Sequence, residues 1–111
     1  MSNQTEEQSI DLIIIDDNSS LTDAWKFYGK SVGKRVKAFN TIPSINEIIN
    51  YNINIPIYID SDLGCAISGQ EYAKELHELG FLNLYLSTGF PANYFGDLPW
   101  IKEIIGKEPP F

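Results

Sequence analysis

Residues 12–17 read LIIIDD, a run of four large apolar residues followed directly by two aspartates. An unbroken apolar run of this length is typical of a strand that is buried on both faces, as in the parallel sheet of an α/β protein. Residues 57–60 read IYID and show the same pattern, because the apolar run again stops at an acid. The two stretches together predict parallel strands that both end in aspartate.

Strand-like and helix-like segments alternate along the rest of the chain. The other expected strands are 36–39, 82–86 and 101–105. A first helix is expected to begin at Ser20, which can act as its N-cap. Two more helices are expected to begin at residues 44–47 and 68–71, which read SINE and SGQE and match the capping box. This alternation predicts an α/β fold of the flavodoxin-like type, with a doubly wound sheet of five parallel strands in the order 2-1-3-4-5.

The expected helices differ in how well they are specified. The apolar stripe of the first comprises Leu21, Trp25, Tyr28 and Val32. The apolar face of the second comprises Ile45, Ile48 and Ile49. Both sets are expected to face the core. Residues 91–100 contain two prolines and a glycine, so the fourth helix should be short or irregular, and no fifth helix is expected before the last residue, Phe111.

The composition argues against several classes of function. The chain has 8 basic and 15 acidic residues, a net charge of −7, whereas nucleic-acid-binding domains usually carry basic patches that neutralise phosphates. A single cysteine excludes an internal disulfide. No apolar stretch approaches the roughly 20 residues of a membrane span, so we expect no membrane association and a cytoplasmic location. Residues 1–9 are expected to be a disordered tail ahead of one domain over residues 10–111.

The acids at the strand ends are expected to meet. Ligands of open parallel sheets bind beyond the carboxyl ends of the strands, where the strand order reverses, and this point lies between the first and third strands. Asp16, Asp17 and Asp60 should therefore converge there. Each like-charged pair at ~4 Å and an effective dielectric of ~20 costs about 4 kcal/mol, so one acid is protonated or a cation such as Mg²⁺ is present. The alternative is that these acids only end strands and cap helices.

The residues at these positions resemble the receiver domain of response regulators and hybrid histidine kinases, over about residues 10–111. The resemblance rests on Asp16-Asp17, the strand 57–60, Gly69, Thr88-Gly89 and Lys107 ahead of a proline. Each of these features is weak alone, but their order and their positions at strand ends are specific. The form without a fifth helix is similar to receivers of some hybrid kinases.

The resemblance implies a function and a role for each residue. Asp60 would accept a phosphoryl group from a histidine kinase or a histidine phosphotransfer protein, in a chain that assists its own phosphorylation and dephosphorylation but is not otherwise an enzyme. The implied Mg²⁺ ligands are Asp16, Asp17, Asp60 and the backbone carbonyl of Asp62. Lys107 would pair with the phosphoryl oxygens. The hydroxyl of Thr88 would bond them after transfer, with Ser87 as the alternative.

The sequence departs from the usual receiver pattern in four places. The loop from Asp60 to Gly69 is one residue longer than usual. Lys107 is followed by Glu108 and then two prolines, which leaves open whether a cis-proline orients the lysine. Ile104 stands where many receivers have an aromatic residue that swings on activation, so aromatic switching is not expected. Without a fifth helix, one face of the sheet should be open. A second copy of the chain, a histidine-containing partner or the tail 100–111 is expected to cover it.

Two other functions remain open on the sequence. The step Asp60-Ser61-Asp62 after an apolar strand resembles the nucleophile motif of haloacid-dehalogenase-type phosphatases, but that family has its further acids downstream, whereas the acid pair here lies upstream. The stronger alternative is a pseudo-receiver, a protein-binding module that keeps the fold and is not phosphorylated. The altered proline step and the missing helix favour this alternative, and the retained aspartates and Lys107 favour the phosphoacceptor.

Overall fold

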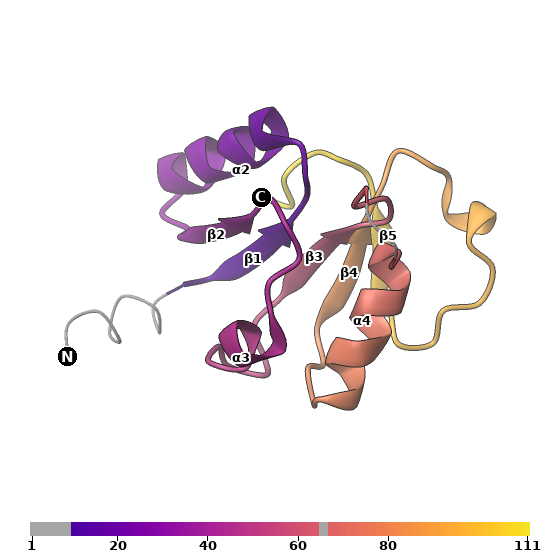
Figure 1. Cartoon of the computed structure of the whole chain (residues 1–111). Coiled ribbons are helices and arrows are strands. Elements are labelled where there is room, and N and C mark those ends of the chain that lie inside the picture. The colour runs from indigo at the N-terminus through magenta and orange to yellow at the C-terminus, as the bar shows by residue number, and fades with distance from the viewer. Residues whose placement is uncertain (1–9, 65–66) are drawn as a thin grey trace.

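The computed structural model of the chain describes residues 10–64 and 67–111. Within these residues, five parallel strands form one sheet in the order β2-β1-β3-β4-β5 (Figure 1). The strands are β1 (Leu12–Ile15), β2 (Val36–Phe39), β3 (Ile57–Asp60), β4 (Leu84–Ser87) and β5 (Glu103–Ile105). The predicted strand order and direction are confirmed. The prediction of a disordered tail over residues 1–9 lies outside the described residues.

Helices cover both faces of the sheet. The helix α2 (Ser19–Ser31) lies on one face, and α3 (Ile45–Ile48) and α4 (Gly69–Glu78) lie on the other (Figure 1). Trp25 of α2 is fully buried in the core cluster on its side, and Leu76 of α4 is fully buried in the opposite cluster. The predicted flavodoxin-like, doubly wound α/β fold is confirmed. In the described part of the chain, no helix is both long and apolar enough to cross a bilayer.

The two central strands, β1 and β3, are buried along their whole length. Ile13 and Ile15 point into the core cluster beneath α3 and α4, whereas Leu12 and Ile14 point into the cluster beneath α2. Because both faces are covered, apolar side chains fill residues 12–15 and 57–59, and the acid Asp60 stands only at the carboxyl end of β3. Burying each isoleucine contributes about 1.5–3 kcal/mol relative to leaving it exposed.

The start of α2 differs from the sequence prediction. Asn18, and not Ser20, is the N-cap, and its Oδ1 accepts a hydrogen bond of 3.2 Å from the backbone N–H of Leu21. Ser20 lies inside the helix and is exposed. Asn and Ser cap helices about equally well, so the choice was decided by the path of the chain as it leaves β1.

The other two predicted N-caps are present. Ser44 accepts a hydrogen bond from the N–H of Glu47 at the start of α3. At the start of α4, Ser68 and Glu71 form the complete capping box, in which each side chain accepts a bond from the other residue's backbone N–H. These starts are specified by residues three apart in the sequence, which is why they could be predicted.

The predicted apolar faces of α2 and α3 are partly wrong. Four of their residues are exposed: Tyr28 (53%), Val32 (54%), Ile45 (39%) and Ile49 (51%). The buried side of α2 instead follows Thr22, Trp25 and Gly29. A Cβ atom at Gly29 would lie 2.7 Å from Cγ2 of Val36, so the glycine allows the helix to approach β2 closely. Trp25 together with two smaller residues, Thr22 and Gly29, therefore forms the side of α2 that meets the sheet.

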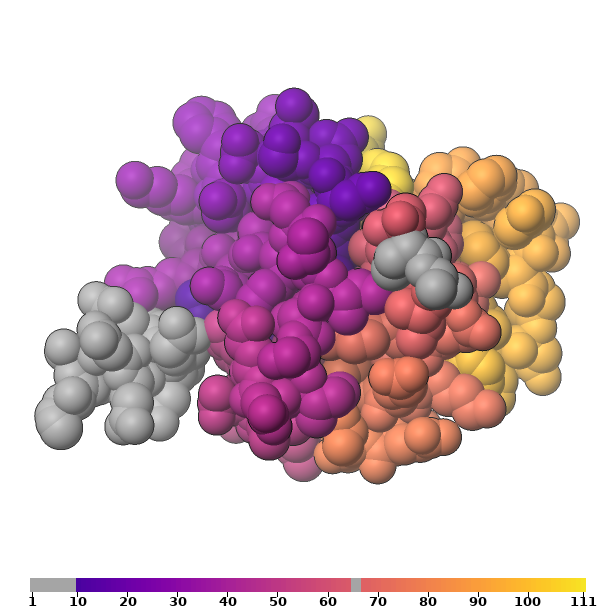
Figure 2. Space-filling model, viewed as in Figure 1, coloured from indigo at the N-terminus to yellow at the C-terminus, as the bar shows by residue number. Residues whose placement is uncertain are grey.

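The segment between β4 and β5 contains only the short 3₁₀ helix η1 (Ala92–Tyr94), as the prolines predict. Figure 2 shows this segment as the orange lobe at one side of the molecule. The rings of Phe90 and Tyr94 stack at a centroid distance of 4.6 Å, and Phe95 packs edge-on against Tyr94. β4 and β5 each begin two residues later than predicted.

The end of the chain returns to the α2 face of the sheet. The ring of Phe111 lies 6.4 Å from that of Trp25, edge to face. The C-terminal residues therefore cover part of this face. Tyr85 and Ile105 of the same cluster remain partly exposed. A second copy or a histidine-containing partner on the rest of this face stays a prediction.

The N-cap of α2 can be tested by two matched substitutions. Asn18→Ala removes the side-chain acceptor for the first helical turn, and we expect it to lower the free energy of unfolding by about 1 kcal/mol. Ser20→Ala should change it by less than about 0.5 kcal/mol, because Ser20 is exposed inside the helix. Urea unfolding followed by circular dichroism measures both. Asn18→Ser should restore stability, and equal losses at the two positions would contradict the assigned cap.

Candidate functional site

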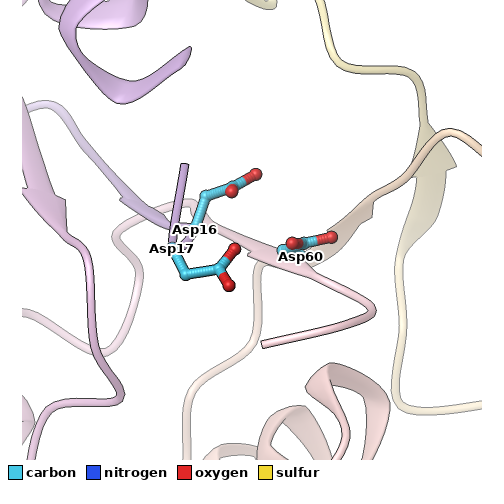
Figure 3. A group of neighbouring side chains, drawn as sticks. All are labelled: Asp16, Asp17 and Asp60. Carbon is cyan, nitrogen blue, oxygen red and sulfur yellow. The ribbon is translucent and has the colours of Figure 1, made fainter. Parts of the chain in front are cut away.

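Three aspartates meet at the carboxyl end of the sheet. Asp16 and Asp17 directly follow β1, and Asp60 is the last residue of β3. Each contributes a carboxylate oxygen to a group whose members all lie within 4.8 Å of one another (Figure 3). β1 and β3 are adjacent in the sheet, with Ile15 beside Ile59, so the acids that follow these strands are brought to the same edge. The structure thus brings together the three acids that the sequence predicts to converge.

Lys107 forms ion pairs with two of these acids. Its Nζ donates a hydrogen bond of 2.7 Å to Oδ2 of Asp16 and one of 2.8 Å to Oδ1 of Asp60. The side chain of Asp16 is 1% exposed and that of Asp60 is 12% exposed, whereas the Lys107 side chain is 33% exposed. Buried carboxylates are costly unless they are paired. The one ammonium group bonds two of the three acids and balances one unit of their negative charge.

Burial and the ion pairs change the pKa values of this group. Burial raises the pKa of Asp60, and the nearby charge of Asp16 raises it further, while the hydrogen bond and the charge of Lys107 oppose the shift only in part. Burial by itself lowers the pKa of Lys107, but the hydrogen bonds to Asp16 and Asp60 and the negative charges of these two acids together outweigh burial, so that the pKa is raised. Lys107 is therefore held as a cation between the two carboxylates at neutral pH.

The structure separates the two candidate hydroxyl groups. The hydroxyl of Ser87 donates a hydrogen bond of 3.0 Å to the carbonyl of Gly106, and its side chain is fully buried. Thr88 lines the same cavity as the aspartates. Its Oγ1 lies 2.9 Å from Oγ of Ser61 and accepts a hydrogen bond of 3.2 Å from the N–H of Phe90. The geometry favours Thr88 over Ser87 for contact with a ligand of the aspartates.

One cavity joins these groups. Its volume is about 420 Å³. Its walls include Asp16, Asp17, Asp60, Asp62, Thr88 and Lys107. Asp62 lies beside the acids, and its backbone N–H bonds Oδ1 of Asp60 at 3.3 Å. Carboxylates, one ammonium group and the hydroxyl groups of Ser61 and Thr88 suit a ligand that combines a hard cation with an anionic oxygen group.

The comparisons with known proteins agree with this architecture. No protein-family model and no curated protein matches the sequence. Among solved structures, the chain is similar to a CheY-like response regulator receiver domain protein from Methanospirillum hungatei JF-1, with a TM-score of 0.72 and 21% identity over 86% of this chain and 79% of that one. The chain has the fold of a response-regulator receiver domain.

Two further structures support the receiver fold. A response regulator from Burkholderia pseudomallei, whose structure contains a phosphorylated aspartic acid, a calcium ion and citrate, matches with a TM-score of 0.68 and 17% identity, over 88% of this chain and 59% of that one. The N-terminal domain of a three-domain response regulator from Carboxydothermus hydrogenoformans matches with a TM-score of 0.66 and 18% identity, over 87% and 81% of the two chains. At these identities the likeness concerns the fold.

The structure also answers the question about the step after Lys107. No peptide bond within residues 10–64 or 67–111 is cis, so the receiver fold is completed here without a cis-proline. Ile104, at the position where many receivers have an aromatic residue, is a partly buried residue of β5. Because isoleucine has no aromatic ring, we still expect no aromatic switching at this position.

Sequence reasoning missed two residues that support the site. Asn40 donates hydrogen bonds of 2.8 Å to the carbonyl of Asp16 and 3.0 Å to Oγ1 of Thr22, and so holds the turn after β1. Ser61 bonds the Thr88 hydroxyl. Both residues directly follow a strand, Asn40 after β2 and Ser61 after β3, so the rule that singled out the aspartates could also have found them.

Gly69 is required by a close approach of two backbones. Its N–H donates a hydrogen bond of 3.1 Å to the carbonyl of Ser61. A Cβ atom at this position would overlap the carbonyl oxygen of Asp60 and lie 2.7 Å from its carbonyl carbon. The first turn of α4 thus lies directly against the backbone that carries Asp60, and only glycine leaves room for it.

Gly69→Ala should therefore damage both the fold and the site. Because backbone atoms cannot yield as a flexible side chain can, we expect a loss of about 3 kcal/mol or more in the free energy of unfolding. Gly89→Ala is the matched control, since a Cβ atom there would meet nothing within 4 Å. Thermal unfolding of both variants measures the effect. A wild-type stability of the Gly69 variant would contradict the close approach.

The ion pairs of Lys107 predict a pH dependence. A lysine whose pKa is raised on folding stabilises the folded state below its ordinary value of 10.5, and this contribution is lost as the pH rises through the folded pKa. Without divalent cations, Lys107→Met should lower the free energy of unfolding by about 2 kcal/mol at neutral pH. The difference from wild type should shrink toward about pH 11. Lys102→Met, which removes an exposed lysine, should show no such trend in urea unfolding at the same pH values.

Proposed function

We propose that this chain is a phosphoacceptor receiver domain of a two-component phosphorelay, in which Asp60 takes a phosphoryl group from a histidine kinase or a histidine phosphotransfer protein. One observation carries the proposal. The Lys107 ammonium bonds Asp16 and Asp60 at the same time, in a cavity that Asp17 and Thr88 also line. This arrangement provides a nucleophile, a cation and a hydroxyl donor in one place, which phosphoryl transfer requires.

The transfer step follows from the groups in the cavity. A carboxylate oxygen of Asp60 attacks the phosphorus atom of a phosphohistidine, and the new P–O bond forms as the P–N bond breaks. The imidazole leaves with the electron pair of the broken bond and takes up a proton, and Asp60 becomes an acyl phosphate. Lys107 is positioned to neutralise charge on the phosphoryl oxygens, and Thr88 to donate its hydroxyl proton to one of them.

A divalent cation fits the donor set. Asp16, Asp17 and Asp60 offer carboxylate oxygens that lie within 4.8 Å of one another, and carboxylates with water are the ligands that Mg²⁺ prefers. The backbone carbonyl of Asp62, which lines the same cavity, is the further ligand that we propose. When bound, Mg²⁺ supplies positive charge that balances the acids and the incoming phosphoryl group. The presence of a calcium ion and a phosphorylated aspartic acid in the Burkholderia structure supports this assignment.

The proposal is tested by the mass of the intact protein after incubation with acetyl phosphate, with and without Mg²⁺. Wild type should gain the mass of one phosphoryl group only when Mg²⁺ is present. Asp60→Asn should gain none, because the amide cannot attack phosphorus. Asp23→Asn is the matched control: its side chain on α2 is 73% exposed and lies outside the cavity of the aspartates, so this variant should still be labelled.

The outcomes separate the candidate functions. Labelling of Asp60→Asn would move the phosphoacceptor to another residue. The absence of any mass gain in wild type would contradict the proposal and support the pseudo-receiver, a binding module that is not phosphorylated. Labelling that does not depend on Mg²⁺ would contradict the role of the cation and leave that of Asp60 intact.

A further inference from the structure

Lys107 lies outside every helix and strand of the described chain. β5 ends at Ile105, and residues 106–111 form no regular structure. A lysine side chain has a flexible four-carbon stem, so its ammonium group reaches a given point only if the backbone is held in place. Since the ammonium bonds both Asp16 and Asp60, the contacts that hold the backbone here matter for the site.

Two buried side chains hold the backbone at this point. The hydroxyl of Ser87 in β4 donates a hydrogen bond of 3.0 Å to the carbonyl of Gly106. The indole Nε1–H of Trp25 in α2 donates one of 3.0 Å to the carbonyl of Lys107 itself. The two donors bind successive carbonyls and come from different elements, a strand and a helix. They act as a two-point clamp on the segment that carries the lysine.

The clamp is itself rigidly mounted. Ser87 and Trp25 are both fully buried. The Trp25 ring packs edge to face against Tyr58, with centroids 5.3 Å apart, and against Phe111 on its other side. Tyr58 lies two residues before Asp60 in β3. The indole therefore connects the backbone of the lysine with the strand that carries the proposed nucleophile.

We propose that Ser87 and Trp25 are positioning residues, which set the place of the Lys107 ammonium relative to Asp60. Neither residue lines the cavity of the aspartates, so neither touches the reacting atoms. Their action passes through the carbonyls of Gly106 and Lys107. The inference rests on the proposed function, because it assigns these residues a part in phosphoryl transfer, but the clamp also acts on the Lys107 ion pairs in the absence of any phosphodonor.

The inference predicts the behaviour of two variants. Ser87→Ala removes one donor with little change in volume, and Trp25→Phe removes the other but keeps an aromatic ring. Each should lower the initial rate of Asp60 phosphorylation by acetyl phosphate at saturating Mg²⁺ by about tenfold or more, because small displacements of a catalytic group cost one to two orders of magnitude. Trp100→Phe is the matched control. It also loses an indole donor, whose bond of 2.9 Å goes to the carbonyl of Gln70 in α4, and its rate should stay within about twofold of wild type.

A purely structural role is distinguished by repeating the substitutions in a Lys107→Met background. Positioning residues act only through the ammonium group, so Ser87→Ala and Trp25→Phe should then cause no further loss of rate. Equal losses with and without the ammonium would overturn the inference. Ser87→Ala decides the matter alone if Trp25→Phe does not fold, since it removes a single hydroxyl group.

A second readout needs no phosphorylation. If the clamp places the ammonium, the stability lost on Lys107→Met should be smaller in the Ser87→Ala background than in wild type, as measured by urea unfolding without divalent cations. If wild type is not labelled, this result counts against the proposed function alone. The coupling between Ser87→Ala and Lys107→Met in the free energy of unfolding would still test the clamp. If wild type is labelled and both Ser87→Ala and Trp25→Phe are labelled at the wild-type rate, the positioning role is contradicted and the proposed function is not.

Discussion

The ammonium group of Lys107, shared between Asp16 and Asp60, is the interaction on which the rest of the arrangement depends. The sheet places acids at the ends of β1 and β3, and burial makes their negative charges costly unless a cation is near. Lys107 comes from the opposite end of the chain, after β5, and supplies that cation. The pairing therefore connects the first, third and fifth strands at one edge, and a divalent cation can complete the charge balance of the three acids.

Two glycines make this geometry possible. Gly69 lets the first turn of α4 lie on the backbone of Asp60, and Gly29 lets α2 approach β2 closely. In both places a single methyl group would push apart elements that the site needs together. The absence of a side chain at these two positions is as important for the site as the charges of the residues that line it.

The α2 face of the sheet has a second role beside burial. Trp25 is a core residue by its exposure, and at the same time its indole holds the carbonyl of Lys107. Phe111 packs against that indole. The tail that covers this face therefore also helps to hold the backbone of Lys107 in place. Packing and the geometry of the site are thus linked through one side chain, which α2 contributes from a position 82 residues before Lys107 in the sequence.

The sequence by itself determined the sheet, its strand order, the meeting of the three aspartates and the capping box at Ser68. These features depend on local patterns: an apolar run that ends in an acid, or a cap and its partner three residues apart. Only the tertiary structure decided that Asn18 caps α2, that Tyr28 is exposed, that Thr88 and not Ser87 lines the cavity, and that Trp25 holds Lys107. The cap depends on the path of the chain as it leaves β1. The other three depend on how closely distant backbones approach and on where the side chain between them points, and none of these is encoded in the periodicity of one segment.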